Sequence, residues 1–217
     1  NLSMKITKKG YTLSGISLLK LAEKYGTPVY VYDAKKINKQ YETLLNAFKG
    51  VNMKIRYACK ALTNQNILKL LRSYGSGLDT VSIQEVQLGL MAGFKPKEII
   101  FTPNGVSIDE INKAVELGVH INIDNISILE QFGHIHSGKI PICIRINPHI
   151  MAGGNYQIST GHIDSKFGIS VHQLRHVERV MKSTGVKVNG LHMHTGSEIL
   201  SVDVFLRGVE ILFEAAK

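Results

Sequence analysis

Short apolar runs alternate with amphipathic stretches from about residue 53 onward, and this alternation is the feature that most constrains the fold. The apolar runs predict strands at 53–59, 77–81, 98–102, 119–124, 140–146 and 186–194. The stretches between them repeat apolar residues at helical spacing and predict helices at 64–74, 83–92, 108–117, 127–135, 171–184 and 202–216. Strict alternation with short connections is typical of a parallel sheet covered by helices.

The ends of these helices carry repeated local signals. Three of the helices begin with Ser-Ile-x-Glu, at 82–85, 107–110 and 127–130. In this pattern the serine and the glutamate can both satisfy free amides of the first turn. Glycines stand where four helices should end, because a left-handed backbone costs glycine little: Gly75, Gly93, Gly118 and Gly185.

Residues 1–33 precede this alternation and have a different pattern. Residues 11–13 predict a strand, Ser14 predicts the cap of a short helix, and the β-branched and aromatic run at 28–32 predicts a second strand. Residues 34–48 then predict an amphipathic helix with one buried face.

Two arrangements of the parallel sheet remain open, an open doubly wound sheet and a (β/α)8 TIM-type barrel. No Gly-x-Gly-x-x-Gly follows the first strand, which weakens the dinucleotide-binding version of the open sheet. The chain offers about six βα units where a closed barrel needs eight. If the fold is a barrel, we therefore expect it to be incomplete within these residues.

Every predicted strand has a polar or ionisable residue at or near its carboxyl end. In chain order these residues are Lys60, Asp79, Asn104, Asp124, Arg145 with Asn147, and His192 with His194. The carboxyl ends of the strands meet at one mouth of a barrel, so the pattern predicts an active site there. Asp79 and Asp124 also fit a role as turn or cap residues. The histidine pair also suits a metal site, although no third ligand stands at the right spacing.

Charge and cysteine content exclude several classes of protein. The net charge is +9, but the lysines are scattered and the chain has no Trp, which argues against nucleic-acid binding. No apolar run is long enough to cross a membrane, and the N-terminus does not resemble a signal peptide. Cys59 and Cys143 lie in predicted strands, which favours buried free thiols and a reducing compartment. We therefore expect a cytoplasmic protein.

Seven short segments carry a family resemblance. They are Tyr-Ala-Cys-Lys-Ala (57–61), Gly-Leu-Asp-Thr-Val-Ser-Ile-Gln-Glu (77–85), Asn-Gly (104–105), Arg-Ile-Asn-Pro (145–148), Ser-Thr-Gly (159–161), Ser-Lys-Phe-Gly-Ile (165–169) and Gly-Leu-His-Met-His-Thr-Gly-Ser-Glu (190–198). In this order they resemble diaminopimelate decarboxylases, which are pyridoxal-phosphate enzymes built on the alanine-racemase-type barrel. Tyr-Ala-x-Lys alone is shared with ornithine and arginine decarboxylases, whereas the segments from 145 to 169 favour the diaminopimelate branch.

The resemblance implies a function and a set of site residues. The enzyme would decarboxylate meso-2,6-diaminopimelate to L-lysine, the last step of bacterial lysine biosynthesis, as a homodimer with pyridoxal 5'-phosphate as cofactor and no metal. Lys60 would form the internal aldimine with the cofactor. His194 would stack on the pyridine ring, and Ser197 would help to hold the phosphate. Ala58, Asp79 and Arg145 would complete the cofactor-binding residues.

The chain also departs from the family pattern. It lacks the Gly-rich phosphate loop, the Glu-Pro-Gly-Arg segment, and the Cys and Tyr that a partner subunit contributes, and Val106 stands where many members have lysine. We therefore expect an amino-terminal portion that is inactive alone, with 1–33 belonging to the family's C-terminal β-domain and 34–217 forming a partial barrel. A related ornithine or arginine decarboxylase, a racemase of the same fold, or a non-catalytic barrel module remains an alternative.

Overall fold

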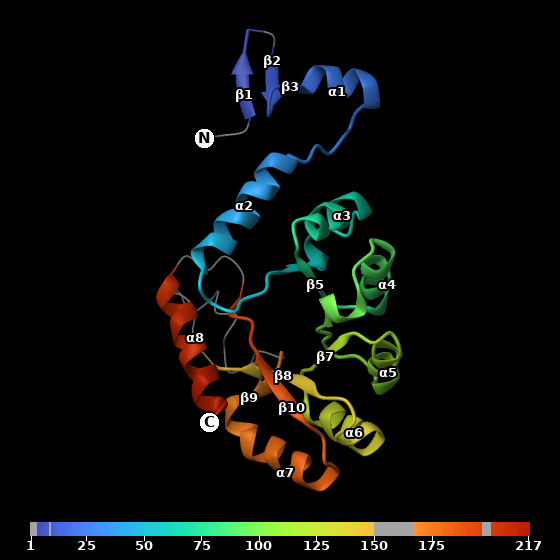
Figure 1. Cartoon of the computed structure of the whole chain (residues 1–217), viewed down its shortest axis with the longest axis vertical. Helices are drawn as coiled ribbons and strands as arrows, with labels where there is room; N and C mark the ends of the chain where they lie inside the picture. Colours follow the sequence, from blue (N-terminus) through green and yellow to red (C-terminus); the bar gives the residue numbers. More distant parts are fainter. Residues whose placement is uncertain (1–3, 9, 150–166, 197–200) are drawn as a thin grey trace.

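The computed structural model describes residues 4–8, 10–149, 167–196 and 201–217, which form two separate sheets. One is a three-stranded sheet in the order β1-β2-β3. The other is a seven-stranded sheet in the order β10-β8-β7-β6-β5-β4, with β9 paired to β8. Figure 1 shows the small sheet and α1 at the amino-terminal end of the molecule, with α2 leading from them towards the larger sheet.

All strand pairs in the larger sheet are parallel, as the sequence predicts. The strands are β4 (Arg56–Ala58), β5 (Gly77–Thr80), β6 (Ile99–Phe101), β7 (His120–Ile123), β8 (Ile142–Asn147), β9 (Ile169–Ser170) and β10 (Val188–His192). The six predicted strands are confirmed but shorter, because the ends of the apolar runs continue into connections. The two-residue β9 was not predicted. Among the described strands, β4 and β10 stand at the two ends of the pairing order.

Helices follow the strands in the predicted alternation. They are α3 (Gln65–Ser73), α4 (Ile83–Met91), α5 (Ile108–Glu116), α6 (Ile126–His136), α7 (Leu174–Thr184) and α8 (Val202–Ala215), with single turns of 3-10 helix at η1 (Cys59–Ala61), η2 (Pro96–Glu98) and η3 (Val171–Gln173). Each helix from α3 to α6 contacts the next, and Figure 1 shows them in succession along one side of the sheet. No helix in the described part of the chain has the length and apolar character of a membrane span.

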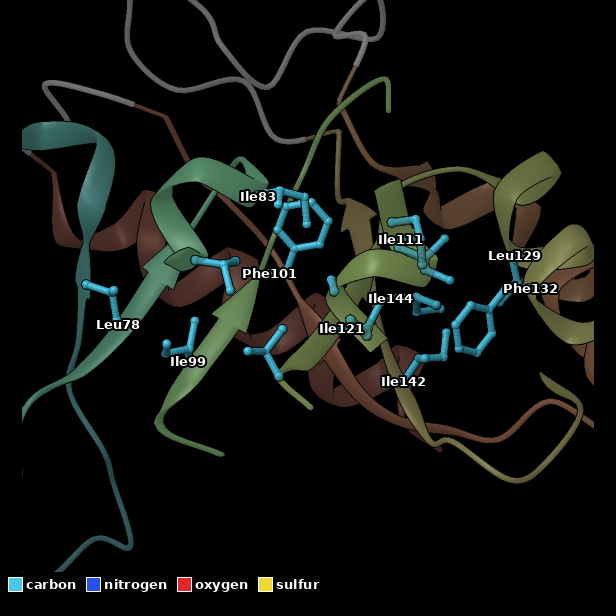
Figure 2. Packing of buried hydrophobic residues seen from close by; sticks show 14 of the residues in the cluster. Leu78, Ile83, Ile99, Phe101, Ile111, Ile121, Leu129, Phe132, Ile142 and Ile144 are labelled. Carbon is cyan, nitrogen blue, oxygen red and sulfur yellow. The ribbon is translucent and has the colours of Figure 1, made fainter. Parts of the chain in front are cut away.

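The hydrophobic core lies between the sheet and these helices. Ile121 and Ile123 on β7 and Ile144 on β8 are almost completely buried, and Figure 2 shows Ile121 and Ile144 near Phe132 of α6. Because successive side chains of a strand point to opposite faces, Asn122 and Arg145 lie on the other face of the sheet. The packing of the helices therefore leaves a row of polar side chains on the face that they do not cover.

One glycine is needed for the helices to approach the sheet closely. A Cβ atom on Gly89 of α4 would lie 2.5 Å from Leu78 Cδ2 and 3.1 Å from Ile99 Cδ1. Real Cβ atoms do not come within 3.0 Å of another carbon, so a larger residue would require the buried Leu78 side chain or α4 itself to shift.

Two of the three predicted serine caps are confirmed. Ser82 accepts from the Glu85 amide at 3.2 Å, and Ser107 accepts from the Glu110 amide at 3.4 Å. The third is wrong: Asn125 caps α6 by accepting from the Ile128 amide at 2.9 Å, and Ser127 lies inside the helix. Asparagine caps at least as well as serine, so the helix begins two residues earlier. The four predicted helix-ending glycines all have positive φ.

The amino-terminal region differs from the prediction at two places. It contains β1 (Met4–Thr7), β2 (Gly10–Leu13), β3 (Ile16–Ser17), α1 (Leu18–Tyr25) and α2 (Ala34–Ala47). Ser17, and not Ser14, caps α1, whereas Ser14 lies in the turn before β3 and donates to Asp33 Oδ2 at 2.7 Å. The strand predicted at 28–32 is wrong, because this exposed run has no neighbouring strand among the described residues with which to pair. The predicted helix at 34–48 is confirmed, but its predicted buried face is wrong, because no residue of α2 is buried against the rest of the described chain and Leu44, Leu45 and Phe48 are exposed.

Candidate functional site

Lys60 follows the first strand of the larger sheet. Strand β4 ends at Ala58, and the chain then makes the single 3-10 turn η1, closed by the Leu62 amide donating to the Cys59 carbonyl at 3.1 Å. The turn buries Cys59 completely and leaves Lys60 exposed. The predicted position of Lys60 at the carboxyl end of a strand is therefore confirmed, although the strand ends two residues before it.

Asp79 lies next to this turn and is held by a chain of hydrogen bonds. Its neighbour across the parallel register is Ala58, the last residue of β4. Thr102 Oγ1 donates to Asp79 Oδ1 at 2.6 Å, and Asn122 Nδ2 donates to Thr102 Oγ1 at 2.9 Å. Thr102 and Asn122 are buried, with exposed fractions of 5% and 1%. Three neighbouring strands thus contribute to one polar line across the sheet.

Opposing effects act on the pKa of Asp79. Burial raises this pKa above its ordinary value, and the negative charge of Glu85 adds to the rise. The hydrogen bond from Thr102 lowers it, as do the positive charges of Lys60 and Arg145. Burial has the largest effect, so the net change is a raised pKa. Lys60 and Arg145 therefore both act on the Asp79 carboxyl group.

Glu85 of α4 is a buried carboxylate whose charge acts on Asp79. Its Oε2 accepts from the Val81 amide at 2.8 Å, one residue earlier than the serine amide that a capping box would use. The contact closes the turn from β5 into α4 and keeps the charge of Glu85 near Asp79. Burial raises the pKa of the Cys59 thiol to about 11, and the charges of Glu85 and Asp79 add to the rise. Cys59 and Cys143, the two cysteines of the chain, are both free thiols, as predicted, but only Cys59 is buried and Cys143 is half-buried.

Arg145 connects this side of the site with the histidines. It lies on β8 opposite His192 of β10 in the parallel register. Burial lowers the pKa of the Arg145 guanidinium, and the charges of Asp124 and Asp79 oppose that change. The guanidinium carbon lies 5.1 Å from the centre of the Phe167 ring. Arg145 therefore brings a positive charge to Asp79 and Asp124 on one side and to His192 of β10 on the other.

The two histidines differ in exposure. Burial, followed by the charges of Arg145 and His194, lowers the pKa of His192 to about 4. Its Nδ1 atom is buried and has no hydrogen-bond partner within the described ranges. His194 lies beyond the end of β10 and is more exposed than His192, and its pKa is lowered first by the partial desolvation of its ring and then by the charges of Arg145 and Lys60. Both imidazoles therefore favour the neutral form at pH 7.

The structure brings most of the predicted site residues together. The charges of Lys60 and Arg145 act on Asp79 and His194, the charge of Asp124 acts on Arg145, and the charge of Arg145 acts on His192. Asn104 is exposed and lines a cavity of about 450 Å³ beside Asp124. Ser197 lies outside the described residues. Within those residues, no group of three or more His, Cys, Asp and Glu side chains could hold a metal ion.

Sequence reasoning missed two members of the site, Thr102 and Asn122. Thr102 directly follows the buried Phe101 at the end of β6, and Asn122 lies between the buried Ile121 and Ile123 on β7. This alternation was visible in Ile121-Asn122-Ile123-Asp124, because an inward-facing Asn on an otherwise apolar strand needs a partner. The partner itself could not be named before the register of the strands was known.

Comparison with known proteins gives one family and a consistent set of relatives. Residues 34–217 match the family described as pyridoxal-dependent decarboxylase, pyridoxal binding domain. The diaminopimelate decarboxylase of Methanothermobacter thermautotrophicus is 38% identical over 216 residues, which is 98% of this chain and 50% of the relative. That of Helicobacter pylori is 37% identical over 202 residues, 91% of this chain and 50% of the relative. The chain spans about half the length of the curated relatives that it matches.

Solved structures agree with these relatives. A diaminopimelate decarboxylase from M. jannaschii in complex with L-lysine has a TM-score of 0.86 and 28% identity, covering 98% of this chain and 52% of that one. The Helicobacter pylori enzyme complexed with L-lysine has a TM-score of 0.83 and 35% identity, covering 92% and 52%. A lysine/ornithine decarboxylase from Vibrio vulnificus, with a TM-score of 0.77 and 22% identity over 91% and 50%, shares the fold alone.

Proposed function

The chain belongs to the pyridoxal-dependent decarboxylases, of which it carries the pyridoxal-binding domain, and from this premise we propose that the whole protein converts meso-2,6-diaminopimelate to L-lysine. Lys60 is the residue that bonds to pyridoxal phosphate in this proposal. The observation that carries it is the position of Lys60, just after the first strand of the sheet, where its charge acts on both Asp79 and His194.

The side chains at this position fit the chemistry of the cofactor. Pyridoxal phosphate supplies an aldehyde that bonds to an amine and a ring that accepts the electron pair released when a carboxyl group leaves. Lys60 offers a primary amine that is exposed at the carboxyl end of the strand. His194 offers a flat ring that favours the neutral form. Arg145 adds a positive charge to a site that must receive a dianionic phosphate.

Each residue has a separate task in this proposal. Lys60 must lose its proton before its nitrogen can bond to an aldehyde. Asp79 accepts from Thr102 and holds a charge near Lys60, which limits where the Lys60 amine can lie. His194 provides a planar contact, and an uncharged imidazole packs against another ring at a lower desolvation cost than a cation would. Ser197 helps to hold the phosphate, and Ala58 lies beside the cofactor.

The substrate follows from the relatives rather than from a substrate subsite. Relatives named diaminopimelate decarboxylase reach 38% identity and match 98% of this chain. By contrast, the lysine/ornithine decarboxylase is only 22% identical. This difference favours diaminopimelate over the substrates of other decarboxylases or of racemases with the same fold.

We also propose how this chain fits into the whole enzyme. Residues 34–217 form part of a (β/α)8 barrel, and residues 1–33 contribute to a β-domain. The end positions of β4 and β10 support this arrangement, since further strands between them would close the barrel. The whole enzyme is a cytoplasmic homodimer that acts on a small-molecule amino acid, without nucleic acid or membrane. The 217-residue chain alone is inactive in this proposal.

A substrate panel on the full-length protein tests the proposed reaction. Meso-diaminopimelate, ornithine, arginine and alanine are each incubated with the protein and pyridoxal phosphate, and both carbon dioxide release and racemisation are measured. We expect carbon dioxide release with meso-diaminopimelate, and a loss of at least about a thousandfold in Lys60→Ala. Preference for another substrate would identify a different enzyme of this fold. Cofactor binding without turnover of any substrate would identify a non-catalytic module.

A further inference from the structure

We propose that Thr102 and Asn122 are positioning residues that fix Asp79 beside Lys60, because Asn122 commits the single hydroxyl hydrogen of Thr102 to Asp79 Oδ1. This inference rests on the proposed function for the role of Lys60. The hydrogen-bond chain itself stands on the geometry of three strands and needs no cofactor.

The chain of hydrogen bonds has a direction. Asn122 Nδ2 can only donate, and it donates to Thr102 Oγ1 at 2.9 Å. The Thr102 hydroxyl has one hydrogen, which is then available for Asp79 Oδ1 at 2.6 Å. A carboxylate that accepts a hydrogen bond is stabilised in its charged form. Asn122 therefore acts on Asp79 through Thr102 without touching it.

The buried position of Asn122 supports a task of this kind. Asn122 is 1% exposed and stands between the core residues Ile121 and Ile123 on β7. Its Oδ1 is buried without a hydrogen-bond partner in the described part of the chain. Leaving a buried acceptor without a hydrogen bond destabilises the fold. An apolar side chain at this position would avoid that cost, so the amide is better explained by what its Nδ2 group does.

Asp79 needs such support because some of its neighbours favour the charged carboxylate and others favour the neutral carboxyl group. Lys60 from η1 and Arg145 from β8 favour the carboxylate, whereas burial and Glu85 from α4 oppose it. The Cys59 thiol from η1 also faces Asp79. Among the interactions that favour the charged form, the hydrogen bond from Thr102 is the strongest. Removing it should shift the balance towards the neutral carboxyl group.

The consequence concerns the amine of Lys60. A charged Asp79 attracts the Lys60 ammonium and restricts where the long lysine side chain lies before it meets the cofactor. A neutral Asp79, free to turn about its side-chain bonds, would restrict it less. Thr102, at the end of β6, and Asn122, on β7, thus contribute to the orientation of Lys60 without contacting it.

The test measures the Asp79 carboxyl in cofactor-free, full-length protein. Carbon-13 NMR of labelled aspartate follows each carboxyl with pH, and Asp79→Asn assigns the signal. We expect Thr102→Val and Asn122→Leu to raise the Asp79 pKa, and Thr102→Ser, which keeps the hydroxyl, to restore the wild-type value. The matched control is Thr80→Val, which removes another buried hydroxyl of the same sheet, one that donates to the Ile100 carbonyl.

Two outcomes would overturn the inference. One is an Asp79 pKa in Thr102→Val and Asn122→Leu that stays at the level of Thr80→Val. The other is a failure of Thr102→Ser to restore the wild-type value. If Asn122→Leu does not fold, Asn122→Asp keeps the site filled while drawing the Thr102 hydrogen away from Asp79, and it should also raise the Asp79 pKa.

Borohydride trapping of pyridoxal phosphate on Lys60 separates this inference from the proposed function. If trapping occurs in the wild type but the Asp79 pKa does not change in Thr102→Val, the positioning inference is wrong and the proposed function stands. If the Asp79 pKa follows the expected order but nothing is trapped in the wild type, the proposed function is wrong and the hydrogen-bond chain stands. When both hold, we also expect slower trapping in Thr102→Val than in Thr80→Val.

Discussion

Acidification should destabilise the folded protein through His192, the last residue of β10. In the fold its pKa is lowered from 6.5 to about 4, first by burial and then by the charges of Arg145 and His194. In the unfolded chain the imidazole binds a proton near its ordinary pKa. Between these two values the unfolded state therefore holds more protons than the folded state. The contribution of His192 to stability is complete above pH 6.5 and is lost as the pH falls towards 4.

The size of the effect follows from the two pKa values. Lowering the pH from 7.5 to 4.5 should cost about 2.5 kcal/mol of unfolding free energy through His192 alone. Other groups titrate over the same range, so the wild type must be compared with His192→Asn, which cannot take up a proton there. The variant should lose about 2.5 kcal/mol less stability than the wild type between these pH values.

Urea unfolding of the full-length protein, followed by circular dichroism at constant ionic strength, measures this difference. His134→Asn is the matched control, because it removes an exposed histidine from α6 and leaves His192 and His194 in place. It should lose as much stability as the wild type between these pH values. Losses that agree within about 0.5 kcal/mol in the wild type and His192→Asn would refute the reasoning, because His192 would then titrate alike in both states.

Two further predictions concern the packing of α4 and the proposed contact of His194 with the cofactor ring. Gly89→Ala should destabilise the fold by about 1–3 kcal/mol in urea unfolding, although alanine is the better helix former, because its Cβ would collide with Leu78. The exposed Gln87→Ala on the same helix should be nearly neutral, and a stabilised Gly89→Ala would contradict the packing described above. His194→Phe should keep more affinity for pyridoxal phosphate in equilibrium titration than His194→Ala, because phenylalanine retains a flat ring. Equal losses would show that the imidazole acts through a hydrogen bond instead.

The sequence predicted those parts of the fold that depend on local signals. Strand and helix alternation, the glycines that end helices, and the Ser82 and Ser107 caps are all encoded within a few residues. The run at 28–32 has strand-forming residues but no paired strand within the described part of the chain, so its composition was misleading. At α6 two cap candidates compete two residues apart, and a local pattern does not rank Asn125 above Ser127.

The candidate site was predictable as a group of residues but not as a network. Lys60, Asp79, Arg145 and His194 lie towards or beyond the carboxyl ends of strands, and parallel strands bring these ends together. The hydrogen bond from Thr102 to Asp79 joins residues on different strands, and its existence depends on the register between them. The buried Nδ1 of His192, which has no hydrogen-bond partner in the segments that the structure describes, likewise depends on what surrounds it in three dimensions.

The central claim is that Lys60 bonds to the cofactor, and reduction of the loaded full-length protein tests it most directly. Sodium borohydride makes the bond between a lysine amine and pyridoxal phosphate permanent, and peptide mass mapping then locates the modified lysine. We expect one modified peptide, containing Lys60, that disappears in Lys60→Ala and persists in Lys54→Ala, where an exposed lysine near the start of the same strand is removed. Modification of a different lysine while Lys60 remains unmodified would contradict the claim.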